Sequence, residues 1–260
     1  MNLITSRDNP HVKAIRRLAQ DSTAYRKAGQ FWLEGDHLCR AAVERGVRPV
    51  QIVFTESFWT EQGDQWANLC EQVLVMPDVL FASLSGLESP ARMGFVVAWA
   101  AQTQVLPDAS TVILDRLQDA GNVGAILRCA SAFGYRQVLA IKGAAALWSP
   151  KVLRAGMGAH FGLHLVESAT EADVAVLTVP VLTTSSHEGS FLHELLQNGQ
   201  LQPQCAWLFG HEGQGVSEAL MARARQKVRI AQPGGEESLN VATAAAICLH
   251  ASATAKIEHF

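Results

Sequence analysis

The chain has 260 residues, of which 48% are apolar, 17% are charged and 7% are aromatic. This length accommodates one large domain or two smaller ones, and the apolar content excludes extended disorder. The longest apolar runs, such as residues 95–101, fall far short of the ~20 residues that cross a bilayer. The leading residues turn polar too early for a signal peptide, and the five scattered cysteines include no CxxC pair. We therefore expect a cytoplasmic protein with no membrane segment.

The charge is distributed unevenly along the chain. Residues 1–50 carry nine Lys or Arg and five Asp or Glu, a net charge of +4, whereas the whole chain carries −3. A basic leading segment on an acidic body suggests that a polyanion docks locally. A solvated helix face explains the same charges equally well.

The first hundred residues mix both periodicities. Helical spacing over residues 11–19 puts Val12, Ile15 and Leu18 on one side. Short apolar runs predict strands at 31–35, 51–54, 73–75 and 94–98, with a helix at about 36–45. Residues 100–110 are small and polar and include Pro107, which is typical of a linker. We place the domain boundary near residue 105, which gives domains of 1–104 and 105–260.

After the linker the pattern becomes regular. Residues 111–115 (TVILD) predict a strand, 123–133 a helix that ends at a left-handed Gly134, and 137–141 a parallel strand. Ser149 and Pro150 begin a further helix. Strands near 163–166, 179–183, 205–209 and 227–230 alternate with helices near 188–197, 216–224 and 240–253. This alternation predicts an α/β domain with a mostly parallel sheet.

Three glycine-bearing segments each follow a predicted strand, at residues 115–128, 208–215 and 230–240. Ligands bind beyond the carboxyl ends of strands in open α/β sheets, and glycine lets the backbone approach them closely. A shared site is therefore expected where these three segments meet.

Familiar nucleotide and metal sites do not match these segments. The GNVG at 121–124 lacks the GxGxxG spacing, and no acid ends the second strand of this domain, as a nicotinamide site requires. There is no GxxxxGK[ST]. His160 and His164 lie four residues apart but have no acid nearby, so we expect no metal site.

The ordered motifs DxxxxxGNVGAILRxAxxFG, LFGHEGxG and IxxxGxxESLNVAxAAAI resemble those of the SpoU (TrmH-type) branch of the SPOUT methyltransferases. The resemblance covers about residues 110–255. More loosely, the FWLEG at 31–35 and the stretch at 93–98 resemble the substrate-binding domain that often precedes this one.

This resemblance implies a trefoil-knotted C-terminal domain that binds S-adenosylmethionine, forms a homodimer partly through residues 241–255, and methylates a ribose 2′-hydroxyl of ribosomal or transfer RNA. It implies that the cofactor is held through backbone groups of Gly210, Ile230 and Leu239. It also implies a catalytic and substrate-facing set, which consists of Asn122, Arg128, Glu212, Ser238 and Asn240. Ala120 and Ala231 stand where this family often has proline, a difference that affects loop stiffness more than chemistry.

Arg128 has a chemical rationale within this set. A ribose hydroxyl is a very poor acid, so a cation that stabilises the developing alkoxide contributes most. A guanidinium deprotonates only above about pH 12, so it does not serve as a free base. Our hypothesis is that Arg128 grips an RNA phosphate and polarises the hydroxyl, while Ser238 and Asn240 fix its guanidinium.

Simpler roles remain open for the other residues. Asn122, Ser238 and Asn240 all suit helix starts, and Glu212 suits an exposed loop. For the whole protein, two alternatives remain. One is an inactive RNA-binding or ribosome-assembly protein that retains the fold, and the other is a nucleotide-binding enzyme of ordinary open-sheet topology.

Overall fold

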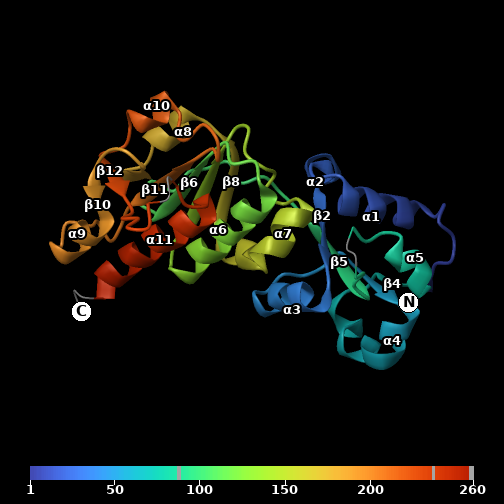
Figure 1. Cartoon of the computed structure of the whole chain (residues 1–260). Coiled ribbons are helices and arrows are strands. Elements are labelled where there is room, and N and C mark those ends of the chain that lie inside the picture. The colour runs from blue at the N-terminus through green and yellow to red at the C-terminus, as the bar shows by residue number, and fades with distance from the viewer. Residues whose placement is uncertain (87–88, 236–237, 258–260) are drawn as a thin grey trace. The chain divides into compact units, whose positions relative to one another are not determined.

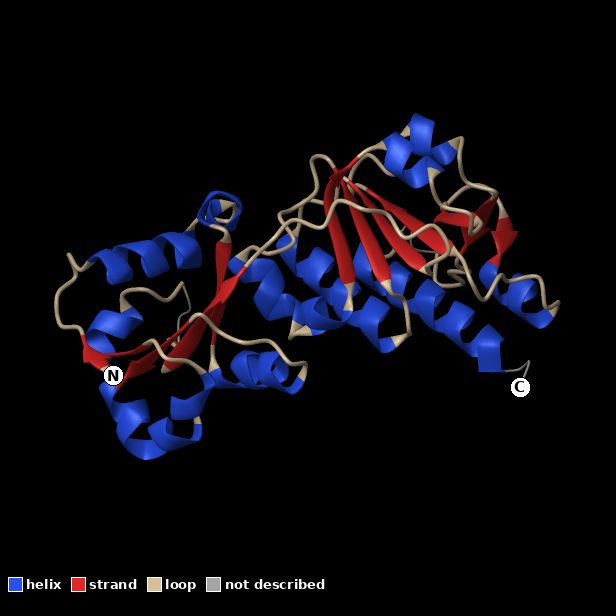
Figure 2. Cartoon of the chain, turned by 180° about the vertical axis from the view of Figure 1, so that it is seen from behind, coloured by secondary structure: helices blue, strands red, loops and turns tan. Residues whose placement is uncertain are grey.

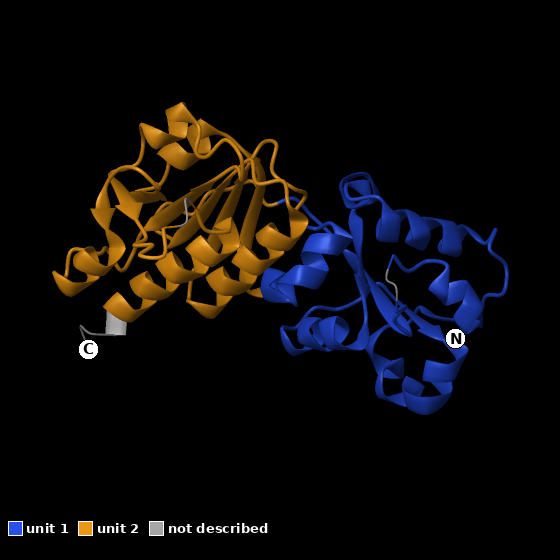
Figure 3. Ribbon diagram, viewed as in Figure 1, with its two compact units in different colours: residues 1–101, 148–161 blue, residues 102–147, 162–260 orange. Residues whose placement is uncertain are grey.

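The computed structural model describes residues 1–86, 89–235 and 238–257, and the chain forms two compact units. Unit 1 consists of Met1–Ala101 and Trp148–Phe161, and unit 2 of Gln102–Leu147 and Gly162–Phe260 (Figure 3). The first division lies close to the expected boundary near residue 105. The sequence does not predict that residues 148–161 return to unit 1, because nothing in their composition distinguishes them from the rest of the second domain.

Unit 1 contains a five-stranded sheet in the order β1-β4-β3-β5-β2, in which β5 runs antiparallel to both of its neighbours and the other pairs are parallel. The strands and helices expected in the first hundred residues all form (Figure 1). The elements of this unit are β1 (Asn2–Leu3), α1 (Pro10–Gln20), α2 (Ala24–Ala28), β2 (Gln30–Glu34), α3 (Asp36–Glu44), β3 (Gln51–Thr55), α4 (Glu56–Gln62), β4 (Val73–Met76), α5 (Asp78–Ala82), β5 (Met93–Ala98) and α7 (Pro150–Gly156).

The core of unit 1 forms where α1 packs on the sheet. Val12, Ile15 and Leu18 are buried, as the helical spacing predicts, and they belong to one cluster with Trp32. Gly94 is required opposite that ring, because a Cβ there would lie 2.3 Å from the Trp32 side chain.

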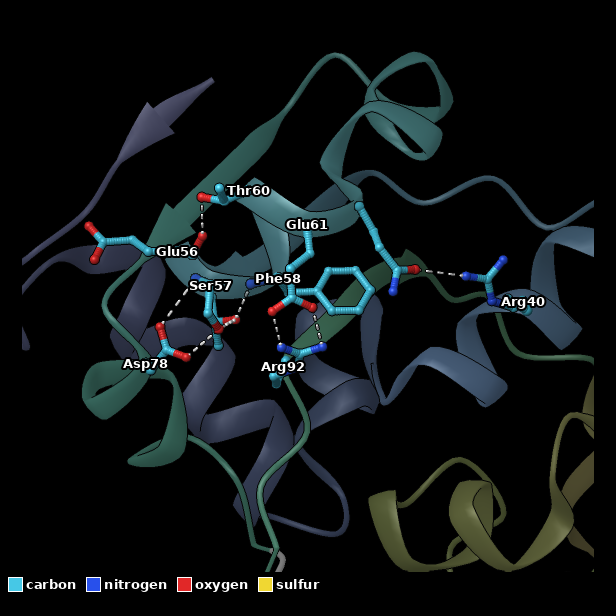
Figure 4. Close-up of polar contacts among 10 residues, drawn as sticks. Arg40, Glu56, Ser57, Phe58, Thr60, Glu61, Asp78 and Arg92 are labelled. Atoms are coloured by element: carbon cyan, nitrogen blue, oxygen red, sulfur yellow. Dashed lines mark hydrogen bonds and ion pairs between the residues drawn. The ribbon is translucent and has the colours of Figure 1, made fainter.

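Polar contacts hold α4 and α7 in unit 1. Asp78 of α5 accepts hydrogen bonds from the backbone N–H (3.3 Å) and the hydroxyl (2.5 Å) of Ser57, and Arg92 pairs with Glu61 at 2.8 Å (Figure 4).

Residues 148–161 contact β2 through an aromatic pair and an ion pair. The rings of Phe31 and Trp148 lie 4.7 Å apart, and Arg154 reaches Glu34 at 3.9 Å.

Unit 2 contains a seven-stranded, entirely parallel sheet in the order β10-β12-β9-β11-β6-β7-β8. This confirms the predicted α/β class. The elements are β6 (Thr111–Asp115), α6 (Ala120–Ala132), β7 (Gln137–Ile141), β8 (His164–Ala169), α8 (Glu171–Ala175), β9 (Val181–Thr184), β10 (Ser190–Phe191), α9 (Leu192–Gln197), β11 (Ala206–Gly210), α10 (Glu218–Met221), β12 (Gln226–Arg229) and α11 (Val241–Ile257).

Helices cover both faces of this sheet (Figure 2). Val174 of α8 and Leu220 of α10 pack against one face, in a cluster with Ile113 and Leu208. On the other face α11 lies beside α6, and the buried Trp207 donates from Nε1 to Ser252 of α11 at 2.9 Å. Both faces of the sheet are therefore buried, as a parallel sheet requires.

Two local expectations need correction. Helix α6 begins at Ala120 rather than Val123, because Asp119 caps it by accepting from the Asn122 backbone N–H at 2.7 Å. The helix expected near 188–197 begins only at Leu192, after the short strand β10. Gly134 adopts a φ of 78°, which confirms the left-handed residue that follows α6.

Candidate methyl-transfer site

The strand order brings two of the three glycine-bearing segments next to each other. β6 is followed along the sheet by β7 and β8 in one direction, and by β11, β9 and β12 in the other. The first two segments follow the adjacent strands β6 and β11, where the strand order reverses direction. Such a switch point is where open α/β sheets bind ligands.

Three side chains connect the three segments by hydrogen bonds. Glu212, from the segment after β11, accepts at Oε1 from the side-chain amide of Asn122 at 3.3 Å. Asn122 in turn accepts at Oδ1 from Nδ2 of Asn240, from the segment after β12, at 3.0 Å. We call Glu212, Asn122 and Asn240 the loop bridge. This chain of bonds confirms that the three turns converge, as expected from their places after parallel strands.

Each end of the loop bridge is also bonded to backbone. The Glu212 carboxylate accepts from the N–H of Asp119 at 3.2 Å and of Gln118 at 3.3 Å. Asn240 accepts at Oδ1 from the N–H groups of Ala242 (2.9 Å) and Thr243 (3.2 Å), in the first turn of α11. Asn240 therefore caps α11 and contacts Asn122 at the same time, so the capping role does not exclude a further role in the site. Asn122, by contrast, is not a cap.

The Glu212 carboxylate is held in its ionised form. Partial burial opposes ionisation, but hydrogen bonds from its own backbone, Asn122, Asp119 and Gln118 outweigh burial and hold the pKa of Glu212 below its usual range. A bridging acceptor rather than a proton donor is the chemical role that this environment supports.

The segment after β11 folds back on itself around His211. His211 and Gly215 exchange two backbone hydrogen bonds, at 3.0 and 2.8 Å. The Nδ1 of His211 accepts from the backbone N–H of Gly213 at 3.0 Å and of Gln214 at 3.2 Å. Because both partners are donors, Nδ1 carries no proton, and the imidazole proton of the neutral ring lies on Nε2.

A cavity of about 460 Å³ lies at the ends of β9, β11 and β12. Its lining includes all three residues expected to hold the cofactor, namely Gly210, Ile230 and Leu239. It also includes Glu212, Ser238 and Asn240. Gly210 is required by the close approach of the backbone, because a Cβ there would lie 2.2 Å from the carbonyl carbon of Gly215. Glu236 and Glu237 of the third motif lie outside the described residues.

Arg128 and Ser238 are placed differently from the hypothesis that joined them. Arg128 lies on an exposed position of α6, and its side chain forms no hydrogen bond or ion pair with any residue in the described ranges. Ser238 is exposed on the cavity rim, and Asn240 bonds to Asn122 instead of to the guanidinium. Within the described part of this chain, Ser238 and Asn240 therefore do not hold the guanidinium of Arg128 in place.

A second polar cluster, which the sequence pattern does not predict, lies at the end of β6. Asp115 is 1% exposed, accepts from the Ser217 N–H at 2.6 Å, and pairs with Arg116 at 2.8 Å. Burial opposes ionisation, but the bonds from Arg116 and Ser217 prevail and lower the pKa of Asp115. Arg116 adopts a positive φ of 59° and also donates to Gln214 at 3.1 Å. An aspartate at the end of the apolar run TVILD was the available signal.

The described helices include none long and apolar enough to span a membrane. Nor do the described residues contain a group of three His, Cys, Asp or Glu side chains placed to hold a metal ion.

A parallel sheet with a glycine-lined cavity at the carboxyl ends of its strands defines a ligand-binding α/β domain, and comparison with known proteins identifies its kind. Residues 109–250 match the SpoU rRNA Methylase family, and residues 9–94 match the MRM3-like substrate binding domain. The chain therefore belongs to the SpoU rRNA methylase family.

Two relatives extend over almost the whole chain. An uncharacterized tRNA/rRNA methyltransferase of Synechocystis is 32% identical and covers 95% of this chain and 92% of its own length. The 23S rRNA (guanosine(2553)-2′-O)-methyltransferase RlmP of Bacillus subtilis is 27% identical, with coverage of 96% and 98%.

The solved structure of the SpoU methyltransferase AviRb from Streptomyces viridochromogenes, in complex with the cofactor AdoMet, is similar with a TM-score of 0.82. The two chains are 23% identical, and the match covers 96% of this chain and 98% of that one. At this identity the likeness concerns the fold, which is that of SpoU methyltransferases.

Proposed function

We propose that the protein transfers a methyl group from S-adenosylmethionine to a ribose 2′-hydroxyl of ribosomal RNA. The observation that carries this proposal is the loop bridge, which ties the three SpoU motifs together at the rim of one cavity. Membership of the SpoU rRNA methylase family, and the activity in the name of the Bacillus relative, support the same reaction and substrate class.

The cavity suits the methyl donor in size and in chemistry. Its volume of about 460 Å³ lies within the ~300–1,000 Å³ usual for small-ligand sites. Gly210 provides a side-chain-free wall, and Val216 and Leu239 provide apolar contact for a ring. Gln232 also lines the cavity, and its buried Oε1 has no hydrogen-bond partner among the described residues. Gly210, Ile230 and Leu239 would hold the cofactor, which supplies an already activated methyl group.

The protein's own contribution is to position the acceptor and to stabilise charge. A hydroxyl oxygen must lie in line with the methyl group at about 3–3.5 Å, and its proton must pass to solvent water as the new oxygen–carbon bond forms. We assign to Arg128 the binding of an RNA phosphate and the stabilisation of the developing alkoxide. The loop bridge holds the three segments in fixed positions relative to one another. Ser238, on the rim of the cavity, faces the RNA.

We further propose that unit 1 selects the RNA, that the C-terminal unit is knotted, and that the protein acts in the cytoplasm as a homodimer. The match of residues 9–94 to a substrate-binding domain supports the first of these roles. An apolar groove along α11 supports the dimer, since it is lined by Phe133, Leu192 and Ala251, and Ile247 on it is 37% exposed. Sedimentation of the purified protein tests the dimer, and substitution of Ile247 by Lys should shift it to monomer.

Methylation mapping tests the reaction itself. Total RNA from cells with and without the gene is compared for 2′-O-methylated positions, and the purified protein is then supplied with radiolabelled S-adenosylmethionine and unmodified rRNA. One ribosomal position should lose its methyl group in the deletion and regain it in vitro. RNA binding without methylation of any rRNA would instead indicate the inactive RNA-binding protein.

A further inference from the structure

Unit 1 contains a small cavity of about 190 Å³ between α1 and the sheet. Its floor is formed by residues of the hydrophobic core, including Ile15, Leu18 and Val96. Its polar wall is formed by one imidazole and three carboxamides, which belong to His11, Gln30, Gln51 and Gln72. Nothing in the proposed reaction uses these side chains.

The polar wall is already ordered by hydrogen bonds. Gln51 is only 7% exposed, and its side-chain amide contacts Nδ1 of His11 at 3.2 Å and Oε1 of Gln72 at 3.3 Å. The side-chain nitrogen Nε2 of Gln51 makes both contacts. The Oε1 of Gln51 accepts no hydrogen bond within the described ranges and is not a fully buried atom, so it can accept from a ligand or from water.

The lining excludes charged occupants and favours a flat heterocycle. It contains no Lys, Arg, Asp or Glu, so a phosphate or an ammonium group would be desolvated there without a countercharge. A nucleobase has two apolar faces and an edge of hydrogen-bond donors and acceptors, and proteins read unpaired bases by stacking, on histidine among others, and by bonds to that edge. The apolar floor, the imidazole and the carboxamides of the polar wall match these features.

Positive charge lies just outside the cavity on the same helix. Helix α1 exposes Lys13 and Arg17, two positions that do not line the cavity. Lys13 pairs with Asp8 at 2.9 Å, but both side chains are well exposed, so this pair is weak and exchanges readily for a phosphate. A strand of RNA can thus place a base inside the cavity and its phosphates on the outer face of α1.

We propose that this cavity binds an unpaired nucleobase of the RNA substrate, with Gln51, Gln72 and His11 as its readers. The inference rests on the proposed function, because it assumes an RNA substrate, and it gives unit 1 a specific contact with that RNA.

The test measures RNA binding by the full-length protein over a series of salt concentrations, with unmodified rRNA as the probe. Gln51→Leu keeps the side-chain size and removes the amide, and Gln72→Ala removes an exposed amide at the rim. We expect the dissociation constant to rise about tenfold and about threefold, respectively. Neutral contacts release no counterions, so the slope of log K against log salt should stay that of the wild type. Arg17→Ala should instead reduce the slope by about one.

Gln20→Ala is the matched control, since Gln20 is exposed on α1 and lies outside the cavity lining. In methylation assays the two cavity variants should raise the KM for RNA by the same factors and leave kcat and the affinity for S-adenosylmethionine unchanged. Wild-type RNA affinity in both variants, or a changed salt slope, would overturn the proposal. If Gln51→Leu does not fold, the surface variant Gln72→Ala decides. A wild-type protein that methylates no rRNA refutes the proposed function and not this contact.

Discussion

Replacement of Glu212 separates a bridging role from a chemical one. The carboxylate accepts three hydrogen bonds, two at Oε1 and one at Oε2, over 3.2–3.3 Å. Exposed bonds of this length fall at the low end of the net range, about 0.5–1 kcal/mol each. Glu212→Ala removes all three and should cost about 1.5–3 kcal/mol, which corresponds to a loss of about 10- to 150-fold in kcat/KM.

Glu212→Gln should be much milder. Its carbonyl oxygen replaces Oε1 and keeps the bonds from Asp119 and Asn122, while its NH₂ meets the N–H of Gln118 and loses only that bond. The expected loss is about 0.5–1 kcal/mol, or about two- to fivefold in kcat/KM. Methyl transfer to rRNA under kcat/KM conditions measures both variants, with Glu218→Ala as an exposed acid outside the cavity for control.

Equal losses in the two Glu212 variants, both of several hundredfold, would refute the bridging role and indicate that the charge acts in the reaction.

The pH dependence of cofactor binding gives a second test of the bridging role of Glu212. Because the folded-state pKa of Glu212 is lowered, its bonds are fully present above the ordinary glutamate pKa of ~4.3 and are lost as pH falls through the lowered value. Affinity for S-adenosylmethionine should therefore hold from neutrality to about pH 5 and then weaken, and Glu212→Gln should lack this acid step.

Substitutions at three further positions test other parts of unit 2. Arg128→Ala should lower kcat by about 100-fold or more and leave cofactor affinity intact. Arg128→Lys should recover less than a tenth of the wild-type activity. Rate assays measure kcat, and calorimetry measures the affinity for S-adenosylmethionine. His211→Asn keeps an acceptor in the place of Nδ1 and should bind S-adenosylmethionine like the wild type, while His211→Ala should bind about fivefold more weakly. Ser252→Ala leaves the buried Nε1–H of Trp207 without its partner and should lower the unfolding free energy in urea by about 1–3 kcal/mol.

The sequence predicts the class of unit 2 well because its signals are local. Strands β6, β7 and β11 are short and have a continuous apolar centre, which is typical of strands buried on both faces. Loops at the carboxyl ends of parallel strands must meet at one edge, so convergence of the three motifs follows from strand assignment alone. The amide contact between Asn122 and Asn240 does not follow from it, because that contact depends on how two helix starts are oriented across 118 residues of sequence.

The assignment of residues 148–161 to unit 1 could not be predicted for a related reason. Ser149 and Pro150 predict the start of helix α7 correctly, and Ser149 caps this helix by accepting from the N–H of Val152 at 3.4 Å. Its partners lie on β2, however, more than a hundred residues earlier, and one of them is the buried Glu34 that pairs with Arg154. A local pattern identifies the helix and its apolar side but carries no information on which sheet that side will contact.

Arg128 and Arg116 differ in whether their guanidinium groups are available to bind an RNA phosphate. Arg116 follows β6 and has its donors engaged, by Asp115 at 2.8 Å and by Gln214 at 3.1 Å, so a phosphate there must compete with a buried carboxylate. Arg128 is exposed and has no such competitor within the described chain, which leaves its whole fork open for an external anion. A charge that is already neutralised inside the protein adds little to phosphate binding. Arg128 should therefore contribute about one to the slope of log K against log salt concentration for RNA binding, and Arg116 close to none.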